Sequence, residues 1–271
     1  MQTKQAVISR ELQLDVTEMA DSHCHLDLIQ NWGIVESAID SGVSTIITDA
    51  VDTKSIVRTL QIADGKNVFA ALGIDPEHAM ELGSGTIDDE LKFCSGLVRE
   101  HAASVVAIGE IGLDYTISKD RLMIERQKKV FDFFLSLADE LGLPASIHAR
   151  GAISDVIGIL KERGFGMAHL HFFEGSVDES KEAERLGCMI SIPPLESGRR
   201  KTIIKSVGLE NLLVESDSPV VGASPLAVRK SIMIVAAAKG ISFEAAAEAL
   251  SSNTKQFFRI GKTASRKLMR Y

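Results

Sequence analysis

Cysteine is scarce in this sequence of 271 residues, which has three: Cys24, Cys94 and Cys188. Their irregular spacing provides neither a disulfide framework nor a Cys-x-x-Cys pair, which argues against a disulfide-stabilised secreted fold and a cysteine-rich zinc site. Free thiols are typical of a reducing compartment, so we expect a cytoplasmic protein.

The sequence also lacks long apolar runs and an excess of positive charge. No stretch approaches the roughly 18 apolar residues of a membrane span, so we expect no membrane contact. The opening MQTKQAVISRELQLDV has scattered charges and no apolar core, which predicts no signal peptide. The formal net charge is −7. If nucleic acid is the substrate, we expect it to bind at a local site and not through the overall field.

What the sequence does contain is a regular alternation of short apolar and longer amphipathic segments. This pattern predicts parallel strands joined by helices, and eight such units indicate a (β/α)8 barrel of the TIM type, with an open doubly wound sheet as the alternative. We predict a single domain over residues 1–271, with an N-terminal extension at 1–18 and a basic tail at 255–271. The expected strands span 19–25, 43–48, 68–73, 105–110, 144–148, 166–171, 188–192 and 212–215. The expected helices span 33–41, 53–63, 87–102, 119–141, 152–163, 178–186, 198–207, 225–239 and 243–250.

Polar residues with metal-binding side chains end several of the expected strands. His23 and His25 form a His-x-His at the end of the first strand, where alternation turns both imidazoles to one side. In such barrels the active site lies at the carboxyl ends of the strands. The candidate ligands are His23, His25, Glu110, His148, His171 and Asp217.

This ligand set contains nitrogen and oxygen but no thiolate, which suits Mg, Mn, Zn, Co or Ni. Six ligands are too many for one four-coordinate ion, so we predict two divalent ions that share a carboxylate. Glu110 is the expected shared ligand because its strand lies mid-barrel. Asp217 is the expected general base, with Glu110 as the second catalytic residue. Among the other histidines, we expect His78 and His101 at the surface, and His169 buried and hydrogen-bonded.

With these residues the sequence resembles the TatD-type metal-dependent deoxyribonucleases, within the amidohydrolase-like superfamily. The resemblance covers about residues 19–258. It rests on DSHCHLD at 21–27, GEIGLDY at 109–115, PASIHAR at 144–150, HFFEGS at 171–176 and LVESDSP at 213–219, together with Gln127, Phe131, Ala138, Asn253 and Thr254.

The resemblance implies a two-metal phosphodiesterase that acts on DNA, on a single strand or from the 3′ end. It also implies that His23, His25, Glu110 and Asp217 hold one ion, and that Glu110, His148 and His171 hold the other. Arg150 matches a family arginine and is a candidate substrate contact.

Three positions depart from the family pattern. Asp75 replaces a histidine thought to approach the substrate phosphate, and remains a candidate substrate contact. Glu174 adds a second acid near the mouth, and the end of the seventh strand reads SIPP at 191–194. The alternatives are therefore an amidohydrolase-like enzyme for a small amide, ester or lactone, and a non-catalytic metal-bound relative.

Overall fold

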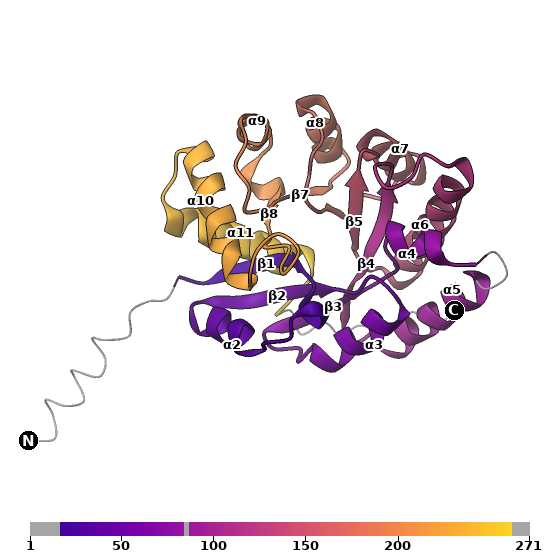
Figure 1. The fold of residues 1–271 in the computed structure, drawn as a ribbon. Coiled ribbons are helices and arrows are strands. Elements are labelled where there is room, and N and C mark those ends of the chain that lie inside the picture. The colour runs from indigo at the N-terminus through magenta and orange to yellow at the C-terminus, as the bar shows by residue number, and fades with distance from the viewer. Residues whose placement is uncertain (1–16, 84–86, 262–271) are drawn as a thin grey trace, which may run out of the picture.

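Eight parallel strands form one sheet in the computed structural model, which describes residues 17–83 and 87–261 (Figure 1). Most strand residues are buried and many are β-branched, which suits strands covered on both faces. The strands are β1 (Met19–Cys24), β2 (Val43–Asp49), β3 (Val68–Leu72), β4 (Val105–Asp114), β5 (Ala145–Arg150), β6 (Ala168–Leu170), β7 (Met189–Ile192) and β8 (Leu212–Val214).

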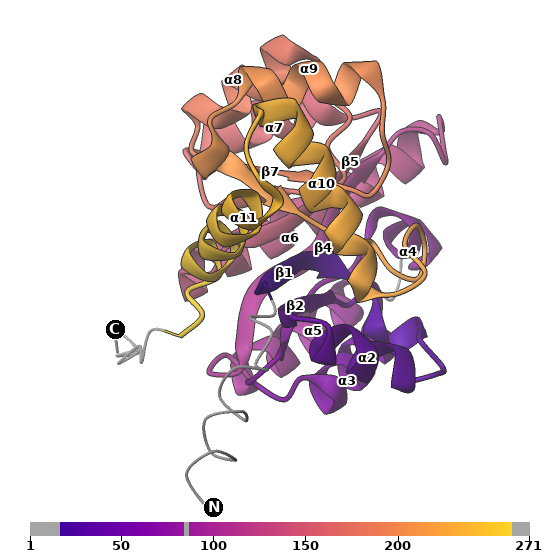
Figure 2. The same cartoon turned by 90° about the vertical axis from the view of Figure 1, so that its left-hand side faces the viewer.

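Helices follow the strands and surround the sheet (Figures 1 and 2). Several begin at a side chain that accepts a backbone N–H, as Asp52, Asp120 and Ser176 do, and end at a left-handed glycine such as Gly142. The helices are η1 (Leu26–Leu28), α2 (Gly33–Asp40), α3 (Thr53–Ile62), α4 (Pro76–Glu81), α5 (Ile87–Glu100), α6 (Arg121–Leu141), α7 (Ile153–Arg163), α8 (Val177–Arg185), α9 (Gly198–Ser206), η2 (Leu209–Asn211), η3 (Pro225–Ala227), α10 (Val228–Lys239) and α11 (Phe243–Phe257).

The strand order in the sheet is the order in the sequence, β1 to β8. The chain segments that follow the outer strands meet at their carboxyl ends. There Asp217 N donates to His23 O at 3.0 Å, and His25 N donates to Ser218 O at 2.7 Å. The predicted (β/α)8 fold is confirmed, and these two bonds join its first and last units beside the candidate ligands.

The interior of the barrel changes character along its axis. A small apolar cluster, which includes Ile47, Phe69 and Leu213, packs against Phe258 from the end of α11. Asp49, at the end of β2, lies two residues after Ile47, and Glu215, directly after β8, lies two residues after Leu213. Both acids are fully buried. Because alternate residues share a face, the apolar cluster supports a polar layer nearer the carboxyl ends.

The strand β4 continues past its predicted end at Glu110 to Asp114. Gly112 makes this possible, because it has φ +142° and a Cβ there would lie 2.0 Å from the carbonyl oxygen of His148. Only glycine fits this close approach to β5. The extension pairs Asp114 with Arg150 and brings its carboxylate to the mouth of the barrel.

Two α-helices, α4 and α11, differ most from the prediction. The short α4 was not predicted; the Asp75 side chain caps it and Pro76 occupies its first turn. The helix α11 extends beyond the expected end at residue 250, through polar residues with weak helix propensity. Tertiary contacts support that extension, since Thr254 is buried and Asn253 Nδ2 donates to the carbonyl oxygens of Leu209 and Leu212.

The predicted N-terminal extension lies outside the described residues except for 17 and 18, and the basic tail is described only to residue 261. Within these parts, Lys255 Nζ lies 2.5 Å from the carboxylate of Glu18, and Arg259 donates to Gly142 O. Among the described helices, none has the length and hydropathy needed to span a bilayer.

Candidate metal centre

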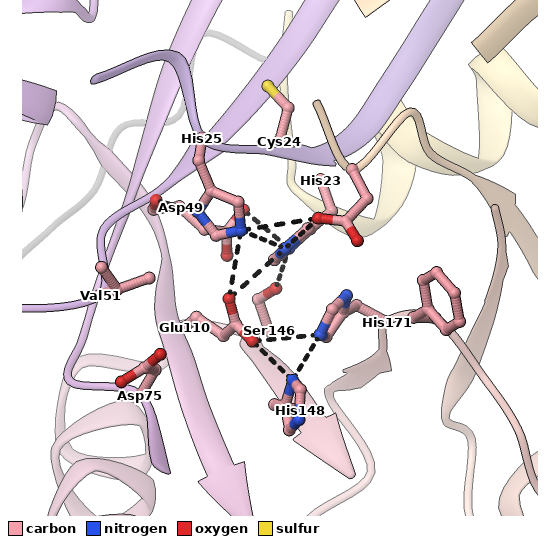
Figure 3. A network of polar contacts seen from close by, with 12 residues as sticks. His23, Cys24, His25, Asp49, Val51, Asp75, Glu110, Ser146, His148 and His171 are labelled. Atoms are coloured by element: carbon pink, nitrogen blue, oxygen red, sulfur yellow. Dashed lines mark hydrogen bonds and ion pairs between the residues drawn. The ribbon is translucent and has the colours of Figure 1, made fainter. Parts of the chain in front are cut away.

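The predicted ligands lie together at the carboxyl ends of the strands (Figure 3). Between them, Glu110 presents its two carboxylate oxygens to different neighbours. One oxygen, Oε2, lies 3.5 Å from His23 Nε2 and 3.4 Å from His25 Nε2. These two nitrogens are 3.2 Å apart. The His-x-His therefore converges on one side of Glu110, as the strand pattern predicted.

The other oxygen of Glu110, Oε1, faces β5 and β6. It lies 2.9 Å from His148 Nδ1 and 3.1 Å from His171 Nε2, which are 3.0 Å from one another. Glu110 thus separates two groups of nitrogen ligands (Figure 3). The groups are close to one another, because the rings of His23 and His171 stack with centroids 4.0 Å apart.

Asp217 completes the first group from the end of β8. Its Oδ1 lies 3.9 Å from His23 Nε2 and 3.6 Å from His25 Nε2. Its backbone has φ +47°, a left-handed conformation that costs a non-glycine residue roughly 1–3 kcal/mol. The hydrogen bond from Asp217 N to His23 O helps to hold this conformation, so carboxylate and histidines are fixed to one another.

His23 and His25 each have a second ring nitrogen, Nδ1, that faces away from Glu110. We call it the remote nitrogen. Asp49 and Ser146, which were not predicted as site residues, contact these remote nitrogens. His25 Nδ1 donates to the carbonyl oxygen of Asp49 at 3.0 Å, which leaves Nε2 with its lone pair toward Glu110. His23 Nδ1 lies 3.1 Å from Asp49 Oδ2 and 3.3 Å from Ser146 Oγ. Asp49 ends β2, so the strand-end rule that identified the other ligands would also have found it.

His148 and His171 differ in the contacts of their remote nitrogens. His148 Nε2 lies 3.2 Å from Asp114 Oδ2, a carboxylate that only the unexpected extension of β4 brings into place. His171 Nδ1 has no hydrogen-bond partner among the described residues, and Glu215 Oε1 is 3.9 Å away. Carboxylates and carbonyls that bind the remote nitrogen of an imidazole are typical of metal-ligating histidines, since they fix its tautomer and orientation.

The surrounding carboxylates change the pKa values of these groups. Burial opposes protonation of His148, but hydrogen bonds with Asp114 and Glu110 outweigh it and raise its pKa to about 10. Burial likewise opposes protonation of His23, yet Asp49 and Glu110 hold its pKa well above its usual value. This negative environment favours cations, and a divalent ion that binds here would displace protons.

The donor set fits a divalent metal site. His23, His25 and Asp217 each offer a ligand atom within 4.8 Å of the others, and so do His23, Glu110 and His171. Imidazole and carboxylate lone pairs that converge in a buried space repel one another unless a cation or protons lie between them. The absence of thiolate ligands suits a hydrolytic ion.

The two candidate substrate contacts lie at the rim. Arg150 ends β5 and is exposed, and its guanidinium has no partner among residues 17–83 and 87–261. Asp75 lies beside the ligand network in Figure 3, with its carboxylate turned to cap α4. His78, which we expected at the surface, is half-buried and lies 2.8 Å from that carboxylate. The hydrogen bond with Asp75 raises the pKa of His78 to about 9.

Other predicted polar residues support the site from below. His169 is buried and hydrogen-bonded as expected, with Ser146 Oγ 3.3 Å from its Nδ1. Asp21 accepts a hydrogen bond from Ser216 N at 2.8 Å and so joins β1 to the segment that follows β8. Burial raises the pKa of Asp21 to about 7 and that of Glu215 to about 8.

Comparisons with known proteins identify the family of this chain. Residues 20–259 match the family described as TatD related DNase. The human deoxyribonuclease TATDN3 is 28% identical over 259 residues, which cover 89% of this chain and 94% of that protein. An uncharacterized metal-dependent hydrolase of Methanocaldococcus jannaschii is 30% identical, over 88% of this chain and 96% of that protein.

Among solved structures, YjjV, a TatD homologue from Escherichia coli, superposes with a TM-score of 0.81 and 26% identity. The match covers 90% of this chain and 99% of YjjV. The fold, the carboxyl-end cluster and these similarities lead to the same conclusion: the chain belongs to the TatD family of metal-dependent hydrolases.

Proposed function

We propose that this protein uses two divalent ions to hydrolyse phosphodiester bonds of DNA. The observation that carries the proposal is the position of Glu110, whose two oxygens face two separate groups of ligands. A carboxylate in that position can be shared by two ions. The deoxyribonuclease names of relatives such as human TATDN3 support DNA as the substrate.

In this proposal His23, His25, Glu110 and Asp217 hold one ion, and Glu110, His148 and His171 hold the other. Bound divalent ions would polarise the phosphoryl group and make water a stronger nucleophile near neutral pH. The ions would be Mg, Mn, Zn, Co or Ni, the metals that suit these nitrogen and oxygen donors.

Asp217 is the proposed general base. After Glu110, its carboxylate is the closest to the Nε2 atoms of His23 and His25 among the described residues, and only 8% of its side chain is exposed. One of its oxygens can bind the ion while the other accepts the proton of the attacking water. Glu110 is the proposed shared ligand. Its role in catalysis would be to hold the two ions at a fixed position relative to one another.

Arg150 and Asp75 are the proposed substrate contacts. The free guanidinium of Arg150 can donate two parallel hydrogen bonds to a phosphate at the mouth. Asp75 is an acid at a position that faces an anionic substrate, but His78 at 2.8 Å offsets its charge. We propose a single DNA strand cleaved from its 3′ end, as the resemblance to the TatD-type deoxyribonucleases implies.

A second candidate is hydrolysis of a small amide, ester or lactone. The acids at the mouth favour it, because Asp75 and the exposed Glu174 stand where a polyanion would have to approach. The same ions and the same base would serve that reaction.

The test is hydrolysis by purified protein loaded with Mn or Mg. We expect release of nucleotides from single-stranded DNA labelled at one end, and loss of release after chelation. Labels at the 5′ and the 3′ end report the polarity. Activity on amides, esters or lactones with none on DNA would replace the first proposal by the second. Both proposed functions require two ions per chain, which elemental analysis would measure.

A further inference from the structure

An unusual basic cluster lies at the start of α9. Arg199, Arg200 and Lys201 occupy its first turn, behind the capping side chain of Ser197. The positive end of a helix dipole favours acids, so three cations there do not serve helix stability. In a (β/α)8 barrel each helix runs back along the strand before it, so this turn lies at the end of the barrel that holds the ligand cluster.

Arg200 differs from its neighbours because it is buried. Only 8% of its surface is exposed, and its Nη1 donates to the carbonyl oxygen of Leu195 at 2.5 Å. The buried Nε has no partner, and no described residue accepts from Nη2. An arginine presents five N–H donors, so this guanidinium keeps donors for a further partner, and its Nε is buried without one.

The charge of Arg200 is also unpaired. Burial lowers its pKa, and Glu174 and Glu215 partly offset that effect, but neither lies within ion-pair distance of the guanidinium. A buried cation without a hydrogen-bonded anion is costly, and natural proteins rarely keep one without a reason. An anion from outside the described chain would provide the missing partner.

Phe172 connects Arg200 to the candidate metal centre. The Arg200 Cζ lies 5.6 Å from the centroid of the Phe172 ring, and that ring lies 6.4 Å from the ring of His171. The backbone of Phe172 has φ +45°, and its N–H is bound to Glu215. One aromatic ring thus separates the buried guanidinium from a candidate ligand.

We propose that Arg200 and the first turn of α9 form an anion subsite that binds a phosphate of the substrate strand other than the one being cleaved. The planar fork of arginine and the N-terminus of a helix both suit phosphate oxygens. This inference rests on the proposed phosphodiesterase function, since that substrate carries several phosphates along one strand.

The experiment compares two substrates in Arg200→Met and in the matched control Arg185→Met. Arg185 is an exposed arginine at the other end of its helix, α8. For a single-stranded oligonucleotide we expect KM to rise roughly 10- to 100-fold in Arg200→Met, the usual effect of losing hydrogen bonds to a charged group. For bis(p-nitrophenyl) phosphate, which has no second phosphate, KM should not change.

Two further variants keep the test decisive if Arg200→Met folds poorly. Arg200→Lys retains the charge without the fork and should raise the oligonucleotide KM less than Arg200→Met. Glu174→Gln changes an exposed side chain and should lower that KM, because it removes a competing negative charge. Equal effects of Arg200→Lys on both substrates would show that Arg200 only positions Phe172 and His171, and would overturn the subsite.

Binding of inorganic phosphate separates this inference from the proposed function. In protein treated with a chelator, so that no ion attracts phosphate to the metal centre, phosphate should raise the melting temperature of the wild type and of Arg185→Met. It should not raise that of Arg200→Lys to the same extent. If phosphate raised the melting temperature equally in the wild type, Arg185→Met and Arg200→Lys, the subsite would be overturned even if the protein cleaved DNA. A smaller rise in Arg200→Lys alone would support the subsite even if the protein did not cleave DNA.

Discussion

The two sides of Glu110 carry similar ligands in different surroundings. On the β1–β8 side, His23 and His25 are held by Asp49, and their exposed side-chain fractions are 0% and 6%. On the β5–β6 side, His148 is 23% exposed and His171 has no hydrogen bond to its remote nitrogen. The first side is built as a fixed site, and the second is more open to water and substrate.

A barrel with these two sides would bind one ion tightly and leave the other open to substrate. Ligands that are buried and held by a second layer of hydrogen bonds lose little freedom when an ion binds, so affinity is high. A site that keeps one exposed ligand can exchange water and admit a substrate oxygen. We therefore expect the ion on the β1–β8 side to bind more tightly than the ion on the β5–β6 side.

The largest expected effect comes from removing the residue that both sides share. Glu110→Ala should lower kcat for DNA hydrolysis by about 1,000-fold or more, because transition-state stabilisation of several kcal/mol is lost with the ions. Elemental analysis should show fewer than two ions per chain. Glu100→Ala, an exposed glutamate on α5, is the control. Full activity in Glu110→Ala would refute the shared-ligand assignment.

The comparison itself is tested by His25→Ala and His171→Ala. We expect His171→Ala to retain one tightly bound ion, while His25→Ala loses the tighter one and shows weak binding only. Titration of the wild type with a chelator should remove the ions in two steps. The β5–β6 ion should leave first, since His148 is the most exposed histidine ligand. Simultaneous release, or the reverse order in the two variants, would contradict the proposed difference.

The second layer should matter less than the ligands. Asp49→Asn and Asp114→Asn should each weaken metal affinity by about 10- to 100-fold, the usual cost of losing a carboxylate behind a ligating histidine. Asp49→Asn should affect the tight ion, and Asp114→Asn the weak one. Asp132→Asn, which changes an exposed carboxylate on α6, is the control. Calorimetric titration with Mn would measure both affinities, and unchanged values would show that these carboxylates serve the fold alone.

The smallest expected effect is a pH dependence of stability without metal. The folded-state pKa of His148, about 10, lies above its ordinary 6.5, so its stabilising contribution is complete below 6.5 and disappears as pH rises to about 10. Added metal should abolish this loss, because ligation requires neutral imidazole.

At the rim, the pKa of His78 is raised to about 9, so its contribution disappears between 6.5 and about 9, with or without metal. Since 31% of its side chain is exposed, we expect only about 0.2–1 kcal/mol from this pair. Urea unfolding of wild type, Asp114→Asn and His78→Gln across this pH range measures both contributions. If added metal changed the pH-dependent contributions of His148 and His78 equally, the proposed difference between the metal centre and the rim would be contradicted.

Much of the fold and the candidate site could be predicted because local patterns carry them. The alternation of apolar and amphipathic segments predicted all eight strands, and the rule that barrel sites lie at strand ends selected six candidate ligands that lie close together in the structure. The short α4 and the extended α11 were missed because capping and packing override weak propensity there.

The supporting residues were harder to predict. Asp114 reaches His148 only because Gly112 lets β4 run close along β5, a contact between strands that no local pattern reveals. Arg200 was indistinguishable from a surface arginine in the sequence, because Phe172, in the loop after β6, contacts it only in the folded chain.

The barrel and the candidate ligands could be read from the sequence, because the periodicity of strands and helices and the chemistry of side chains at strand ends are local properties. How the candidate ligands divide around Glu110, and which carboxylates hold the histidines, became visible in the folded chain alone. The folded chain also shows which arginine is buried without an anion. These features depend on distances between residues far apart in the chain, and such distances are set by packing and not by any local pattern.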